Sequence, residues 1–305
     1  MARHFLGFSD WTGAELTKIL DLADDLKRAR KAREPRRLLE GRTLAMLFEK
    51  SSTRTRVSFE AGMTELGGHA IMLSPRDTQI GRGEPIRDTA RVLSRYVDAV
   101  MVRTYGQEIV EELARWSTVP VVNGLTDQLH PCQLMADLMT ARERLGTISG
   151  LSVTWIGDGN NMARSWVEAS AAFGFRLVLS SPKGYTVEED FIASANARGG
   201  KVSSIPDPVE ASRGVSVVTT DVWASMGQEE EKAERQKAFA GYTVDRRVMD
   251  AALPEAIFLH CLPAYRGLEV TEEVLEGARS AVWDEAENRL HAQKAILVTL
   301  LNDLK

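Results

Sequence analysis

Hydroxyl and guanidinium side chains gather in one short segment of the sequence: Ser52, Thr53, Arg54 and Thr55. The segment follows an apolar run, residues 43–48, and precedes a pattern typical of a helix. Backbone N–H groups are unpaired at the start of a helix, and the helix dipole favours an anion there. An arginine can hold a phosphate through two parallel hydrogen bonds. A helix cap alone needs one hydroxyl, so we predict that this segment binds phosphate, whereas Arg56 could pair with a carboxylate of the chain.

Two further segments place polar groups after apolar runs. Arg103 follows the run 99–102 and, taken alone, is typical of a surface arginine. His130 precedes Pro131, which suits the first turn of a helix. The positive end of that helix would lower the pKa of His130 and keep the ring neutral, as a hydrogen-bond donor. A capping or core histidine fits the local sequence equally well.

The segment Gly157-Asp-Gly-Asn-Asn-Met162 resembles the start of a dinucleotide-binding turn. Met162 stands where the third glycine of that fingerprint belongs, and Ser180-Ser181 stands where a ribose-binding acid is expected. A nicotinamide-dependent dehydrogenase is therefore disfavoured. The same turn still offers Asn160 and Asn161 at the end of a predicted strand.

Three residues of the second half stand at the ends of predicted elements. Asp221 closely follows the apolar run 215–219 and suits a cationic amine, with a turn aspartate as the alternative. Cys261 follows the run 256–260, where a buried structural cysteine is the alternative. Arg289 is expected at the start of the last helix, against the helix dipole, which suggests an anionic partner. Two cysteines and five histidines show no metal-ligand spacing, so we expect no metal.

Short apolar runs alternate with helical patterns through the chain, which is typical of parallel sheets covered by helices. The predicted strands cover residues 43–48, 69–73, 99–102, 119–122, 151–156, 176–179, 201–205, 215–219, 256–260 and 280–284. We predict an α/β fold of two three-layer parallel-sheet domains, residues 1–145 and 146–287, joined by a helix over 131–145. The last helix, residues 288–304, could close the second domain or cross back to the first. In open parallel sheets, ligands bind beyond the carboxyl ends of the strands, where the polar residues above are expected.

Length and charge limit the class of protein. The 305 residues exceed one typical domain. The net charge of −5, from 38 basic and 43 acidic residues, argues against a general nucleic-acid binder. No apolar stretch approaches the roughly 20 residues that a spanning helix needs, so no membrane association is expected. The first residues carry no visible secretion signal and the cysteine content fits a reducing compartment, so we expect a cytoplasmic protein.

Five segments, taken together and in order, resemble motifs of the aspartate/ornithine carbamoyltransferase family. They are Ser-Thr-Arg-Thr-Arg (52–56), Arg103, His-Pro-Cys-Gln (130–133), Asp-Val-Trp-Ala-Ser-Met-Gly (221–227) and His-Cys-Leu-Pro (260–263). The first three motifs are common to the family, and the last two are similar to those of its ornithine-specific branch. The resemblance covers nearly the whole chain. Cys132 stands at a position that varies within the family, so it needs no function.

The resemblance implies the carbamoyltransferase fold, with two domains linked by interdomain helices and the last helix, 288–305, packed back on the first domain. It implies a homotrimer with shared sites, in which Gln79 reaches the carbamoyl phosphate of the adjacent subunit. It also implies an enzyme that transfers the carbamoyl group of carbamoyl phosphate to the δ-amino group of L-ornithine. The products would be L-citrulline and phosphate, in a step of arginine biosynthesis. The implied reaction needs no metal and no organic cofactor, because carbamoyl phosphate is an already activated mixed anhydride.

The same resemblance assigns the site residues. Those that would bind carbamoyl phosphate are Ser52, Thr53, Arg54, Thr55, Gln79, Arg103, His130, Gln133, Cys261, Leu262 and Arg289. Those that would bind ornithine are Asn161, Asp221, Ser225 and Met226. Catalytic roles would fall to Arg54, Arg103, His130, Asp221 and Cys261.

The attacking amine must lose a proton, because an alkyl amine with a pKa near ~10 is only about one part in a thousand neutral at pH 7. Asp221 and Cys261 could orient the amine and pass on its proton, and the leaving phosphate could itself accept one. Two alternatives stand beside this hypothesis. One is a sister carbamoyltransferase that uses putrescine, aspartate or an acylated ornithine, and the other is a non-catalytic binding protein with the same fold.

Overall fold

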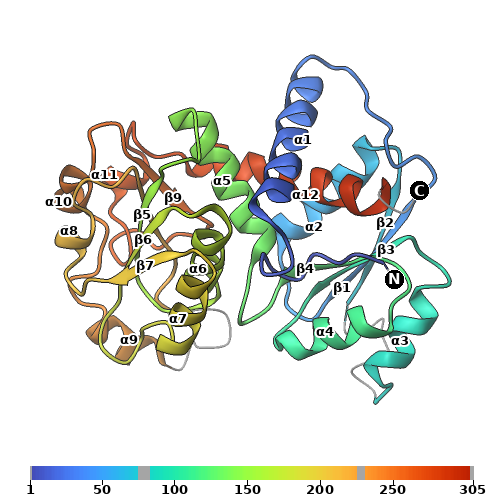
Figure 1. The fold of residues 1–305 in the computed structure, drawn as a ribbon, viewed down its shortest axis with the longest axis horizontal. Helices are drawn as coiled ribbons and strands as arrows, with labels where there is room; N and C mark the ends of the chain where they lie inside the picture. The colour runs from blue at the N-terminus through green and yellow to red at the C-terminus, as the bar shows by residue number, and fades with distance from the viewer. Residues whose placement is uncertain (1, 75–82, 225–230, 303–305) are drawn as a thin grey trace. The chain divides into compact units, whose positions relative to one another are not determined.

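A computed structural model describes residues 2–74, 83–224 and 231–302 (Figure 1). The chain forms two compact units, of which the first contains Met1–Ala136 and Asn288–Lys305 and the second contains Asp137–Glu287. Two helices cross this division: α5 (Pro131–Leu145) and α12 (Val282–Asn302). The predicted fold class of two parallel-sheet α/β domains is confirmed, and the exact domain boundary at residue 146 stays a prediction.

The sheet of the first unit has four parallel strands in the order β2-β1-β3-β4. They are β1 (Thr43–Phe48), β2 (His69–Leu73), β3 (Ala99–Arg103) and β4 (Val121–Leu125). The predicted ranges of β1 and β2 are confirmed. Strand β4 begins later than the predicted residue 119 because Pro120 has no N–H to donate to a neighbouring strand.

Helices cover both faces of this sheet. They are α1 (Gly13–Lys31), α2 (Thr53–Glu65), α3 (Ile86–Leu93) and α4 (Gln107–Trp116). In Figure 1, α3 and α4 lie on one side of the strands, and α1 and α2 lie on the other. The core under α3 and α4 joins Val100 and Val121 of the sheet to Ala90 and Leu113 of the two helices.

The sheet of the second unit has five parallel strands in the order β7-β6-β5-β8-β9. They are β5 (Ser152–Ile156), β6 (Arg176–Ser180), β7 (Lys201–Ser204), β8 (Val217–Thr220) and β9 (Ile257–His260). The helices of this unit are α6 (Asn161–Phe173), α7 (Glu189–Ala197), α8 (Pro208–Ala211), α9 (Lys232–Ala238), α10 (Arg246–Ala251) and α11 (Glu272–Leu275). Val218 and Phe258 of the sheet pack in one core with Met249 of α10 and Leu275 of α11.

The predicted strand at residues 280–284 is wrong. Ser280 makes an isolated parallel bridge to Phe258, and α12 begins two residues later, at Val282. Two acidic residues stand in the first turn of α12, where the helix dipole favours negative charge. A short apolar run does not distinguish a buried strand from the start of a buried helix.

Each sheet reverses its strand order once. The reversal lies between β1 and β3 in the first unit and between β5 and β8 in the second. The connections from two such strands leave in opposite directions, which opens a crevice beyond their carboxyl ends. The polar segments singled out from the sequence follow these strands, so each unit presents its own polar cluster at its reversal.

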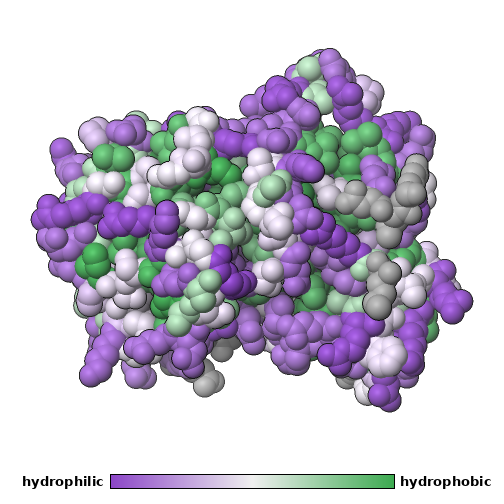
Figure 2. All heavy atoms as spheres, in the orientation of Figure 1, coloured by the Kyte–Doolittle hydropathy of each residue, from purple (hydrophilic) through white to green (hydrophobic). Residues whose placement is uncertain are grey.

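The visible face of each unit is largely hydrophilic in Figure 2, with smaller hydrophobic patches between the charged and polar side chains. Within residues 2–74, 83–224 and 231–302, no helix combines the length and the apolar character that a membrane crossing requires.

Candidate active site

The predicted phosphate segment forms the N-terminus of α2. Ser52 is the N-cap and accepts a hydrogen bond from the Thr55 N–H at 3.3 Å. Thr53 and Arg54 are exposed in the first turn, which contains no acidic side chain. The positive end of the dipole therefore faces no carboxylate of that turn, which favours an external anion.

Arg103 is buried, with 7% of its surface exposed, so the expectation of a surface arginine is wrong. It ends β3 in register with Phe48 of β1, and its carbonyl accepts the Glu49 N–H at 2.8 Å. This position beside the strand reversal explains the burial, and one strand read alone does not reveal its neighbours. A buried guanidinium requires hydrogen-bond acceptors or negative charge around it.

Arg289 contacts three other predicted residues within the first unit. Its Nη2 donates to Thr55 Oγ1 at 2.8 Å, and its Nη1 donates to Gln133 Oε1. His130 Nε2 lies 3.5 Å from the same Nη1. The prediction that Arg289 stands at a helix start is wrong, because α12 begins at Val282, about two turns earlier.

His130 is held neutral by its surroundings. Burial is the largest cause that keeps its pKa well below 6.5, and the charges of Arg289, Arg103 and Arg54 lower it further. The predicted direction is the same, but the prediction relied on a helix terminus rather than on burial among three arginines. A neutral ring in this position can donate a hydrogen bond to a developing negative charge.

Cys132 lies beside this cluster and takes no visible part in it. Its thiol is buried and donates to the Asn123 carbonyl at 3.3 Å. Burial raises the pKa of Cys132 to about 12, so it keeps its proton. It therefore behaves as a structural cysteine.

Asp221 is the centre of the polar cluster in the second unit. It is 8% exposed and directly follows β8. Its Oδ1 accepts the Val222 N–H at 2.8 Å and the Cys261 thiol at 3.2 Å, and its Oδ2 accepts Asn160 Nδ2 at 3.1 Å. These bonds fix both carboxylate oxygens at the crevice, which is the position expected for an amine-binding group.

Cys261 keeps part of its surface exposed, so it is not a fully buried structural cysteine. Desolvation of the thiol, followed by the negative charge of Asp221, raises its pKa well above 9.0. Cys261 therefore remains a thiol and donates to Asp221, whereas a nucleophilic cysteine requires a lowered pKa.

The turn after β9 is held by His260. The backbone N–H of His260 donates to Glu285 Oε2 at 2.8 Å, and its Nδ1 accepts the Leu262 N–H at 2.9 Å. That leaves the proton on Nε2, which lies 3.3 Å from Glu269 Oε1. Leu262 adopts a left-handed conformation with φ of 57°, which the bond to His260 stabilises.

Glu269 and Glu285 were not predicted from the sequence. Both are at most 1% exposed, although acidic residues are typical of surfaces. No spacing relative to the 260–263 motif marks them, and their roles become visible once β9 and α12 are placed.

A buried arginine that was not predicted from the sequence holds the turn after β5. Arg235 of α9 bonds Asp158 Oδ2 at 2.8 Å and the Trp223 carbonyl at 3.0 Å. Gly159 is required between Asp158 and Asn160, because a Cβ there would lie 2.4 Å from the Val187 nitrogen. The turn after β5 and the segment that contains Asp221 are therefore both bonded to the Arg235 guanidinium.

One cluster among the described residues could offer three metal ligands. The ligand atoms of Asp221, His260 and Cys261 lie within 4.8 Å of one another. A metal ion would have to displace Leu262 or Glu269 from the His260 ring, and it would require the Cys261 thiolate. The resting hydrogen bonds therefore fit an organic amine better than a metal.

Of the remaining four predicted site residues, the structure describes Asn161. Asn161 is the first residue of α6 and is partly buried. Gln79, Ser225 and Met226 lie outside the described residues.

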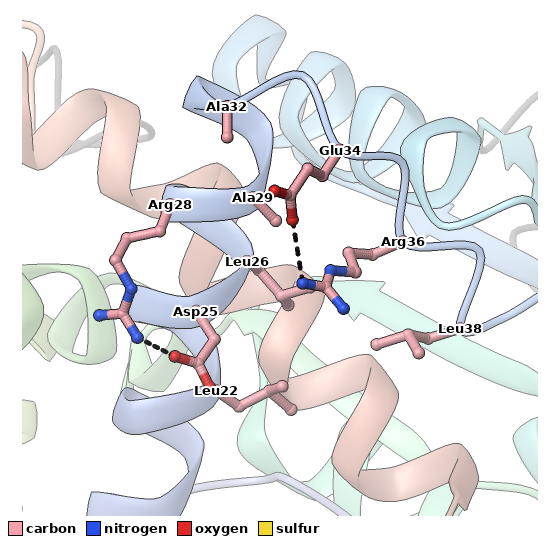
Figure 3. A pocket seen from close by; sticks show the side chains of 9 residues that line it. All are labelled: Leu22, Asp25, Leu26, Arg28, Ala29, Ala32, Glu34, Arg36 and Leu38. Carbon is pink, nitrogen blue, oxygen red and sulfur yellow. Dashed lines mark hydrogen bonds and ion pairs between the residues drawn. The ribbon is translucent and has the colours of Figure 1, made fainter.

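A pocket of about 440 Å³ lies along α1 and the chain that follows it (Figure 3). Its lining residues are Leu22, Asp25, Leu26, Arg28, Ala29, Ala32, Glu34, Arg36 and Leu38. Figure 3 shows that Arg28 pairs with Asp25 and that Arg36 pairs with Glu34. None of the predicted site residues that the structure describes lines this pocket, so it is not assigned to the candidate site.

Both halves of the chain match known family domains. Residues 3–143 match "Aspartate/ornithine carbamoyltransferase, carbamoyl-P binding domain". Residues 149–300 match "Aspartate/ornithine carbamoyltransferase, Asp/Orn binding domain".

Among curated proteins, the ornithine carbamoyltransferase of Syntrophotalea carbinolica is 56% identical over 301 residues, which cover 99% of this chain and 100% of that protein. The ornithine carbamoyltransferase of Geobacter sulfurreducens is 55% identical over 302 residues, with 99% and 100% covered. Among solved structures, the ornithine carbamoyltransferase of Pyrococcus furiosus is similar with a TM-score of 0.95 and 50% identity, covering 100% of this chain and 98% of that one. The anabolic ornithine carbamoyltransferase of Campylobacter jejuni gives 0.92 and 43%, with 99% of each chain covered.

Proposed function

Because the chain belongs to the aspartate/ornithine carbamoyltransferase family, we propose that it transfers the carbamoyl group of carbamoyl phosphate to the δ-amino group of L-ornithine. The products are L-citrulline and phosphate. Curated relatives at 52–56% identity over nearly the whole chain are named ornithine carbamoyltransferase, which supports the ornithine branch.

One observation carries the choice of amine: the contact between Asp221 and Cys261. A carboxylate held at a strand end by a thiol and an amide attracts a cationic amine. The same carboxylate would repel the acidic side chain of aspartate. The geometry therefore favours a diamine acid such as ornithine over aspartate.

Carbamoyl phosphate binds in the first unit under this proposal. Ser52, Thr53, Arg54 and Thr55 offer backbone N–H groups, hydroxyls and a guanidinium to the phosphate, with Arg103 beside them. The first turn of α2 contains no acidic side chain to compete for these donors.

Thr55 is arranged to polarise the carbamoyl carbonyl. Its Oγ1 accepts hydrogen bonds from Arg289 at 2.8 Å and from the Ser52 hydroxyl at 3.1 Å. Two accepted bonds orient the Thr55 O–H outward as a donor. A neutral His130 supplies a second donor, and preorganised donors of this kind are worth about 10²–10³ in rate.

The reaction balances without a cofactor. The amine lone pair forms a C–N bond to the carbamoyl carbon, the tetrahedral intermediate collapses, and the C–O bond to phosphate breaks with its electron pair leaving on phosphate. The δ-ammonium gives up two protons, one before it attacks and one as the C–N bond forms. The leaving phosphate takes up one of them, and the other passes through the site to solvent. Cys261 already holds a proton that its raised pKa retains, so Asp221 is the member of the pair that accepts from the ornithine ammonium. Gln79, Leu262, Ser225 and Met226 keep the binding roles that the family resemblance assigns.

A phosphate-release assay tests the function. Carbamoyl phosphate is combined in turn with L-ornithine, putrescine, aspartate and N-acetylornithine at equal concentration. Ornithine should give the highest kcat/KM, and Asp221→Asn should raise its KM at least tenfold. A higher rate with another amine would replace the substrate assignment, and no release with any amine would favour a binding protein.

A matched pair of arginines tests the phosphate segment. Arg54→Ala should raise the KM for carbamoyl phosphate by 100-fold or more with an unchanged circular dichroism spectrum. Arg56 pairs with Glu60 at 2.9 Å on an exposed face of α2, so Arg56→Ala should behave like the wild type. Equal kinetics for both variants would contradict the assignment of Arg54.

We further propose a homotrimer in the cytoplasm that serves arginine biosynthesis. Strand β2 forms the open edge of its sheet, and Ile71 on it and Val57 on α2 are 40% and 57% exposed. Light scattering should give about 101 kDa for three chains of 33.7 kDa. Growth of an arginine auxotroph that lacks this activity, restored by the wild type and not by Arg54→Ala, tests the biosynthetic direction.

A further inference from the structure

Lys50 is buried beside the phosphate segment, although neither the sequence motifs nor the reaction assigns it a role. It lies between β1 and α2 with 5% of its surface exposed. Its Nζ donates to the Asp127 carboxylate and lies 4.2 Å from the centroid of the Tyr105 ring. A lysine ammonium normally stays in water, so its burial here requires a compensating interaction.

The contacts of Lys50 join the ends of three neighbouring strands. Lys50 follows β1, Tyr105 follows β3, and Asp127 follows β4. Backbone hydrogen bonds also join the segments after β3 and β4. The Asp127 N–H donates to the Tyr105 carbonyl at 2.8 Å, and the Thr104 N–H donates to the Leu125 carbonyl at 3.0 Å.

Each of the three strand ends also carries a residue that binds carbamoyl phosphate. Ser52 stands two residues after Lys50, Arg103 stands two residues before Tyr105, and His130 stands three residues after Asp127. We propose that Lys50, through Asp127 and the Tyr105 ring, is a positioning residue that fixes these three anion-binding segments relative to one another. The inference rests on the proposed use of carbamoyl phosphate.

A direct role of Lys50 on the phosphate makes the opposite prediction for Asp127. If the ammonium bound the phosphate, neutralising Asp127 would leave it free to attract the anion, and affinity would rise or stay unchanged. If Lys50 acts by position, Asp127→Asn and Lys50→Met break the same connection and weaken the anion site alike. The Asp127 side chain is 60% exposed, so Asp127→Asn should not disturb the fold.

The experiment measures four variants: Lys50→Met, Asp127→Asn, the double variant and Lys50→Arg. Controls are Lys18→Met, an exposed lysine of α1, and Asp88→Asn, an aspartate of α3 whose side chain is 46% exposed. Two readouts are taken: the KM values of both substrates, and the dissociation constant of inorganic phosphate by calorimetry. Phosphate binding does not depend on turnover.

We expect Lys50→Met and Asp127→Asn each to raise the carbamoyl phosphate KM and the phosphate dissociation constant about tenfold, with the double variant no worse than either. The ornithine KM, measured at saturating carbamoyl phosphate, should change less than twofold, and Lys50→Arg should recover part of the affinity. Tight phosphate binding by Asp127→Asn, or equal loss for both substrates, would overturn the inference. A wild type that binds phosphate but forms no citrulline would refute the proposed function, while the phosphate titrations would still decide the role of Lys50.

Discussion

The charge state of His130 provides a sharp test of the anion-binding cluster. An ordinary imidazole with a pKa of about 6.5 is about 90% protonated at pH 5.5. Burial, then Arg289, Arg103 and Arg54, hold the pKa of His130 well below that value, so we expect a neutral ring at pH 5.5. Of the three arginines, Arg289 has the largest effect on the pKa of His130, so replacing it with methionine should raise that pKa, while burial continues to lower it.

The same shift links stability to pH with a definite sign. Below pH ~6.5 the unfolded chain protonates His130 while the native chain does not, so the native state is progressively disfavoured as pH falls. From pH 7.5 to 5.5 this one group should cost about 1.4 kcal/mol of unfolding free energy. The loss would end only when the pH passes the low pKa of the folded state.

Two measurements test this reasoning. The imidazole resonances of the five histidines are followed by NMR from pH 7.5 to 5.5, with His130→Gln identifying the relevant signal. Urea unfolding at both pH values compares the wild type with His130→Gln, which should lack the loss of about 1.4 kcal/mol. A His130 signal that titrates with a midpoint near 6.5 would refute the structural argument.

Three further predictions follow from buried polar groups. Burial, followed by nearby lysines and an arginine, lowers the pKa of His291 to about 3. The wild type should therefore lose about 2 kcal/mol of unfolding free energy through this group between pH 7 and pH 5, and His291→Gln should not show that loss in urea unfolding. An identical pH dependence of the two proteins would contradict this. Cys261→Ser keeps a donor for Asp221 whereas Cys261→Ala does not, so kcat/KM for ornithine should differ by roughly 10- to 100-fold between them, and equal values would exclude a role for the bond. Arg235→Met leaves the buried Asp158 without its ion-pair partner and should destabilise the protein by about 3–5 kcal/mol in the same unfolding assay. Adding Asp158→Asn should restore part of that loss. No restoration would show that the broken ion pair is not the cause.

Much of the architecture follows from local sequence because a parallel sheet buries its strands on both faces. The runs at 43–48 and 69–73 are apolar, are bounded by polar residues, and are strands in the structure. The run at 280–284 has a similar composition, yet it forms the start of α12. Strand β9 already ends the sheet there, and only the three-dimensional arrangement shows that the residues after Ser280 leave it.

The site was predictable where residue type and strand end coincide, as for Asp221 and the segment 52–55. It was not predictable where a role depends on a neighbouring strand or helix. Arg103 is buried because β1 pairs beside it. Glu269 and Lys50 act through partners 9 and 77 residues away, and no local pattern relates such positions.

The division of α12 has a consequence for synthesis on the ribosome. Residues 137–287 form a continuous unit, so they can fold as soon as they have emerged. The first unit lacks its last segment until residue 288 and beyond have been translated, although its strands were made much earlier. Arg289, which bonds Thr55 of α2 and Gln133 of α5, is therefore the last residue of this cluster to be translated. A product truncated before it would carry every phosphate-binding motif except that one.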